Sequence, residues 1–66
     1  MNKNLRIART KKGISQKELA VKVGVTNKYI SLIESKGLKP SAEVMWKISK
    51  CVDASVQELF FYDMEE

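Results

Sequence analysis

Residues 15–34, SQKELAVKVGVTNKYISLIE, carry apolar side chains at helical spacing, and a glycine interrupts that pattern near its middle. The apolar positions are Leu19, Ala20, Val23, Ile30 and Ile33. Glycine inside a helix costs roughly 0.5–1 kcal/mol relative to alanine, so Gly24 disfavours one continuous helix. Gly24 suits the end of one helix, and Thr26 suits the N-cap of the next. The stretch therefore predicts two short helices joined by a tight turn, which is a helix-turn-helix unit.

The rest of the chain divides into short helical segments of the same kind. Ser15 with Glu18, and Ser55 with Glu58, each form the pattern of a capping box at a helix start. Ser41 is the expected N-cap of a further helix. Breaks between segments fall at Gly13, Gly24, Gly37, Pro40 and Asp53. No segment alternates with period two over a useful length, so we predict an all-α fold of five helices, the first running from residue 2 or 4 to residue 12.

A chain of 66 residues forms a single domain, here residues 1–66, and buries only about 60% of the surface that its unfolded form exposes. Cys51 is the only cysteine and the sequence has no histidine, so we expect no disulfide, no metal site and no cofactor. Helical spacing turns Cys51 toward the core, which disfavours a redox role. Extra stability has to come from well-idealised helix packing or from oligomerisation.

Positive charge is concentrated in the first half of the chain. Residues 1–36 contain nine Lys or Arg and two acids, whereas residues 37–66 contain three Lys and six acids. This distribution is typical of a polyanion-binding face with a separate end that does not bind, although composition alone is equally compatible with a solvated charged surface. No apolar run approaches the roughly 18 residues needed to cross a bilayer, so we expect no membrane partner.

The second helix of the predicted helix-turn-helix unit has two unlike sides. At about 100° per residue, Tyr29, Ile30 and Ile33 fall on the side that faces the domain. The opposite side collects Asn27, Lys28, Ser31 and Ser35, with Leu32 at its margin. That outward side is small, polar and free of acids, so it can enter a DNA major groove about 12 Å wide without repelling phosphate.

These residues carry a family resemblance. The chain resembles the small DNA-binding domains of the Cro and phage-repressor type, also called the xenobiotic response element family. The matching positions are Leu5, Arg6, Arg9, Gly13, Ser15, Gln16, Leu19, Ala20, Gly24, Val25, Thr26, Ile30, Ser31, Glu34, Pro40, Ser41, Ile48 and residues 56–60. The resemblance covers nearly the whole chain. It implies a compact, lambda-repressor-like domain of five helices with a helix-turn-helix at about residues 15–36, whose third helix reads the major groove of double-stranded DNA.

The resemblance also implies roles for individual residues. The expected base-reading side chains are Asn27, Lys28, Ser31 and Leu32, and the expected phosphate contacts are Ser15, Gln16, Thr26, Ser35, Lys36 and Lys39. Leu32 departs from the polar or basic residue that is commoner in the family, and it either meets a thymine methyl group or packs on the domain. Gly37 lies one residue later than usual, so the path of the following loop stays open. Arg9 and Glu34 are expected to pair inside the domain and not to contact DNA. By its helical angle, Tyr29 is expected to pack at the margin of the core with its hydroxyl in water, and the alternative is that this hydroxyl reaches a phosphate.

The last helix and the tail, residues 55–66, predict a dimer surface. Three aromatic residues in a row, Phe60, Phe61 and Tyr62, cannot all face one small core, so at least one is expected to be exposed. Family members commonly dimerise through this end. The expected interface residues are Leu59, Phe60, Phe61, Tyr62 and Trp46, and the expected assembly is a two-fold homodimer.

The sequence therefore predicts a sequence-specific DNA-binding transcriptional regulator, most simply a repressor that binds a near-palindromic operator as a homodimer in the cytoplasm, where DNA binding would associate it with the nucleoid. The alternative is a protein-interaction module, such as an antitoxin or adaptor, that uses the same fold. An enzyme is disfavoured because the chain has no histidine, no acid pair on one helical face and no phosphate-cradling glycine loop. No small-molecule ligand is expected.

Overall fold

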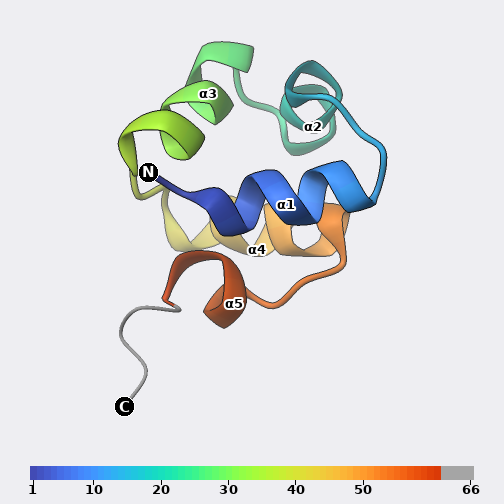
Figure 1. The fold of residues 1–66 in the computed structure, drawn as a ribbon. Helices are drawn as coiled ribbons and strands as arrows, with labels where there is room; N and C mark the ends of the chain where they lie inside the picture. The colour runs from blue at the N-terminus through green and yellow to red at the C-terminus, as the bar shows by residue number, and fades with distance from the viewer. Residues whose placement is uncertain (62–66) are drawn as a thin grey trace.

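The computed structural model describes residues 1–61, which form five α-helices and no strand. The helices are α1 (Lys3–Lys11), α2 (Gln16–Val23), α3 (Asn27–Lys36), α4 (Ala42–Val52) and α5 (Val56–Phe60). Figure 1 shows α1 through the middle of the domain, with α2 and α3 on one side of it and α5 on the other, while α4 lies behind α1. The predicted all-α, five-helix fold is confirmed.

The helix starts follow the predicted capping residues. Ser15 and Ser55 each head a capping box, in which the serine hydroxyl accepts from the N–H of the glutamate three residues later and that glutamate accepts from the serine N–H. The hydroxyls of Thr26 and Ser41 also cap α3 and α4 by accepting from the N–H three residues later, without the reciprocal glutamate bond. The first helix ends at Lys11, one residue before its predicted end at residue 12, and Lys12 is its C-cap.

The core takes at least one side chain from every helix. The fully buried side chains are Leu5, Leu19, Ile30, Ile33, Ile48 and Leu59. Ile7 is 56% exposed, and Cys51 is half-buried at the edge of the core. Apolar residues at helical spacing thus account for the packing without a disulfide.

Two residues predicted at the dimer surface belong to the core instead. Leu59 and Phe60 are 1% and 3% exposed, so neither is available to a partner. The reason is the length of α5: a helix of five residues must direct most of its apolar side chains inward to close this end of the core. Tyr62 lies outside the described residues.

Two asparagine side chains hold α5 in place. Asn2 Nδ2 donates to the Leu59 carbonyl at 2.8 Å, and Asn4 Nδ2 donates to the Glu58 carbonyl at 2.8 Å. The Asn2 N–H also donates to the Glu34 carbonyl at 2.8 Å, and its Oδ1 caps α1. Asn2, which is buried, therefore ties the start of α1 to both α3 and α5.

Candidate nucleic-acid interface

The turn between α2 and α3 allows the chain to change direction within a few residues. Gly24 has a φ of 87°, in the left-handed region that favours glycine, and its N–H donates to the Ala20 carbonyl at 2.8 Å. The Val25 N–H donates to the same carbonyl at 3.0 Å, which closes the end of α2. Ala20 is 3% exposed, so its small side chain permits close packing here. Figure 1 shows α3 leaving this turn along the outer edge of the domain.

The outward side of α3 carries the predicted base-reading residues. Asn27 and Lys28 are exposed, as are Ser35 and Lys36, while Ser31, Leu32 and Tyr29 are half-buried. The backbone N–H groups of Asn27 and Lys28 have no acceptor within residues 1–61, because Thr26 caps only the two that follow. The start of α3 therefore offers two exposed polar side chains beside two free N–H donors, at the end of a helix where anions are favoured.

The single acid of α3 is withdrawn from this surface. Arg9 Nε donates to Glu34 Oε2 at 2.8 Å and Arg9 Nη2 donates to Glu34 Oε1 at 3.1 Å, so the two side chains form the ion pair that the resemblance implies. Their side chains are 14% and 4% exposed, respectively. Arg9 Nη1 also donates to the Ile14 carbonyl at 2.9 Å. Because its charge is buried and neutralised by Arg9, Glu34 does not repel a polyanion at the surface of α3.

Gln16 occupies a different position from the one expected of a phosphate contact. Its side-chain Nε2 donates to Glu34 Oε1 at 3.1 Å, so the amide group adds to the buried pair instead of pointing away from the domain. The backbone N–H groups of Gln16 and Lys17, however, find no acceptor among the described residues. Beside the Gln16 side chain, the start of α2 therefore offers two backbone donors of the kind that bind a phosphate.

The remaining predicted phosphate contacts differ in availability. The hydroxyls of Ser15 and Thr26 accept hydrogen bonds as N-caps, which leaves their hydrogens able to donate. Ser35 Oγ donates to the Ser31 carbonyl at 2.8 Å and would have to rotate to reach a phosphate. Lys36 is exposed in the last turn of α3.

Lys39 does not face the surface formed by α2 and α3. Its Nζ donates to the Phe60 carbonyl at 3.1 Å and lies 4.8 Å from the centre of the Phe61 ring. The carbonyl end of α5 and the face of an aromatic ring both attract a cation, which explains this orientation. Its place in a loop after α3 gave no indication that the lysine would turn toward α5.

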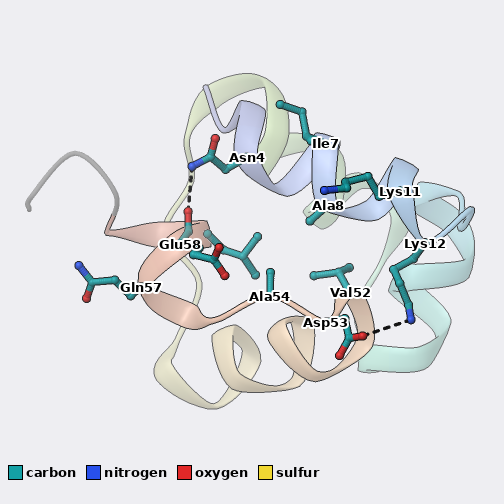
Figure 2. A pocket seen from close by; sticks show the side chains of 11 residues that line it. Asn4, Ile7, Ala8, Lys11, Lys12, Val52, Asp53, Ala54, Gln57 and Glu58 are labelled. Atoms are coloured by element: carbon teal, nitrogen blue, oxygen red, sulfur yellow. Dashed lines mark hydrogen bonds and ion pairs between the residues drawn. The ribbon is translucent and has the colours of Figure 1, made fainter.

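An open groove of about 660 Å³ lies between α1 and the link from α4 to α5. Figure 2 shows its rim, where Lys12 Nζ lies 3.5 Å from Asp53 Oδ2 and Asn4 donates to the Glu58 carbonyl. No residue lining the groove belongs to α2 or α3, so it is separate from the candidate interface. Residues 1–61 contain no group of three or more potential metal ligands, and none of their helices is both long and apolar enough to cross a membrane.

Comparisons with known proteins agree with this arrangement. A model of the helix-turn-helix family matches residues 5–59. The chain is 38% identical, over its whole length and 94% of the relative, to an uncharacterized HTH-type transcriptional regulator of Archaeoglobus fulgidus. It is 30% identical, over the whole of both chains, to one of Methanocaldococcus jannaschii.

Among solved structures, the N-terminal DNA-binding domain of SinR from Bacillus subtilis superposes with a TM-score of 0.75 at 34% identity. The match covers 97% of this chain and 88% of the SinR chain. With the cap-turn-cap geometry of residues 15–36 and the exposed, acid-free side of α3, these matches show that the chain belongs to the helix-turn-helix family of the Cro and phage-repressor type.

Proposed function

We propose that this chain, a helix-turn-helix DNA-binding transcriptional regulator, is a repressor that binds a near-palindromic operator as a homodimer. Occlusion of a promoter is the simplest mechanism for a DNA-binding domain of this kind. The observation that carries the proposal is the start of α3, where exposed Asn27 and Lys28 flank free N–H donors while Glu34 is buried.

Each exposed group has a matching chemistry on DNA. The Asn27 amide can bond bidentately to adenine, and the Lys28 ammonium can reach O6 and N7 of guanine. Ser31 and half-buried Leu32 lie about one turn further along α3, where a methyl group of thymine would suit Leu32. The free N–H groups of Gln16 and Lys17, the hydroxyls of Ser15 and Thr26, and the Lys36 ammonium would hold the phosphates that set the register.

The homodimer is supported by two aromatic side chains that are not fully buried. Trp46 is 57% exposed on α4, and Phe61 is half-buried at the end of α5. In a two-fold dimer, the two α3 helices would have to lie about 34 Å apart to enter successive major grooves.

The test is selection of bound duplexes from a random pool, followed by affinity measurements on the selected site and on random DNA. We expect a two-fold symmetric site with half-sites about 10 base pairs apart. Lys28→Ala is expected to cost about 1–3 kcal/mol on the selected site and to relax preference at one base pair. Lys36→Ala is expected to weaken binding to all sequences and to lower the salt slope by about one.

Lys11→Ala is the matched control, since it removes the same charge from α1, where Lys11 lines the groove that is separate from the candidate interface. Equal losses for Lys28→Ala and Lys11→Ala would remove Lys28 from the base-reading set. Failure to enrich any sequence would instead favour the interaction-module alternative.

A further inference from the structure

Several basic groups surround a small hollow at the end of α3. This hollow, of about 240 Å³, is lined by Met1, Asn2, Lys36, Gly37, Leu38, Lys39 and Phe60. Among the described residues, its lining includes two lysines and no acid. In Figure 1 the N-terminus, the link that follows α3 and the end of α5 all lie on the same side of the domain. The described lining of the hollow therefore carries a net positive charge. Lys36, one of its two lysines, is also a proposed phosphate contact.

The root of the acidic tail is fastened at this hollow. Lys39 Nζ bonds to the Phe60 carbonyl at 3.1 Å and lies against the Phe61 ring, so the loop after α3 holds the point at which the chain continues beyond α5. The next residues in the sequence, Tyr62-Asp63-Met64-Glu65-Glu66, contain three acids and no base. A carboxylate two residues beyond Phe61 stays within about 7 Å of backbone reach from it.

We propose that the chain's own tail, residues 62–66, docks at the hollow through its carboxylates and competes with DNA phosphate for Lys36. Three arguments carry the assignment: the charge complementarity of hollow and tail, the contact that fixes the tail's root, and the short tether. Lys36 and Lys39 both line the hollow, so a carboxylate docked there interacts with both lysines without much screening, since the Debye length is roughly 10 Å at 0.1 M salt. The tail thereby lowers the affinity that the basic half of the chain would otherwise give.

The inference rests on the proposed function only for its competition step, so docking is tested first without DNA. Amide NMR spectra of the wild type are compared with those of Asp63→Asn/Glu65→Gln. We expect the resonances of Lys36 and of residues 37–39 to differ between the two proteins at low salt and to converge at high salt, since the attraction is electrostatic. The control Glu43→Gln/Asp53→Asn removes two acids from ion pairs with Lys47 and Lys12, and it should leave those resonances unchanged.

Competition is tested with duplex DNA. The tail variant is expected to bind about three- to tenfold more tightly than the wild type at low salt, and the gain should vanish at high salt. The gain should also vanish when Lys36→Ala is added, because the competed group is then absent. The control variant has the same net charge as the tail variant, and its gain should be much smaller.

Two results would overturn the proposal: unchanged resonances at the hollow in the tail variant, or equal affinity gains for the tail variant and the control. A gain that persists with Lys36→Ala would equally reject Lys36 as the contested group. If no protein binds any duplex, the proposed function fails, and the NMR comparison alone decides whether the tail docks.

Discussion

At the scale of single residues, Glu34 explains how the helix that we propose to read DNA can contain an acid. Glu34 is 5% exposed, and its carboxylate accepts hydrogen bonds from Arg9 and Gln16. A buried ion pair contributes little net stability compared with apolar residues, but removing one partner leaves a buried charge without compensation. The pair therefore fixes how α1, the start of α2 and α3 lie together more than it stabilises the fold.

The first prediction concerns this pair. Glu34→Gln should lower the free energy of unfolding by about 3–5 kcal/mol, because Arg9 keeps a largely buried charge. The double variant Arg9→Met/Glu34→Gln should be destabilised by clearly less than the sum of the losses in Arg9→Met and in Glu34→Gln. Urea denaturation of the four proteins of the cycle gives the coupling energy directly. Additive losses would mean that the two side chains do not act as a pair.

At the scale of elements, the ends of the helices determine where α3 and α5 lie. Gly37 ends α3 with a φ of 72°, and a Cβ added there would lie 2.8 Å from the Met1 nitrogen. Gly24 has a φ of 87°, but a Cβ added there would meet nothing within 4 Å. Both glycines relieve backbone strain, and only Gly37 also permits a close approach of another segment.

The second prediction separates these two roles. Gly24→Ala should cost about 1–2 kcal/mol through the left-handed backbone alone. Gly37→Ala should cost more, because the start of the chain, held by the bond from Asn2 to the Glu34 carbonyl, must also shift. Thermal unfolding of both variants is the measurement, with Gly24→Ala as the strain-only control. A larger loss at Gly24 would contradict the close packing at Gly37.

The third prediction concerns the attachment of α5. Asn2→Ala leaves the Leu59 carbonyl unpaired, at about 1–3 kcal/mol, and removes the N-cap of α1, at about 1 kcal/mol. Asn4→Ala breaks only one exposed bond and should cost about 0.5–1.5 kcal/mol. Hydrogen exchange of the amides of α5 should report the loss locally, with faster exchange in Asn2→Ala. Equal exchange in the two variants would show that Asn2 does not hold α5.

At the scale of the whole molecule, the core draws on all five helices, and several large apolar side chains, among them Val21 and Trp46, stay exposed. Trp46 is the large exposed aromatic side chain of the described residues, and Lys50 covers part of its ring. The burial of Leu59 and Phe60 shifts the proposed interface from the core face of α5 toward Phe61 and the outer side of α4.

The fourth prediction follows from that shift. Trp46→Glu should convert a dimer to monomer at micromolar concentration, because a charge at the centre of an apolar contact has to be desolvated. Val21→Glu, a change at a residue of α2 that is 74% exposed, is the matched control and should leave the assembly unchanged. Sedimentation velocity distinguishes the species. A wild-type protein that sediments as a monomer would instead remove the homodimer from the proposed function.

Much of the fold was determined by the sequence itself, because helix caps and turns depend on residues that are close together in the chain. Ser15 and Ser55 form capping boxes with glutamates three residues away, and Gly24 takes the left-handed conformation that glycine favours, so helix boundaries could be read within one or two residues. The outward side of α3 was equally predictable, since Asn27 and Lys28 owe their exposure to helical period alone.

Other features were decided only by the tertiary structure, because they depend on partners distant in the chain. The Gln16 amide turns toward Glu34, eighteen residues away in the sequence, and the Lys39 ammonium reaches the end of α5. Asn2 bonds to Leu59, which is 57 residues away in the sequence. The burial of Leu59 and Phe60 also depends on distant partners, because it follows from the packing of α5 against the other helices. Local spacing determines what each helix presents, and packing between helices decides which of those groups remain free to bind.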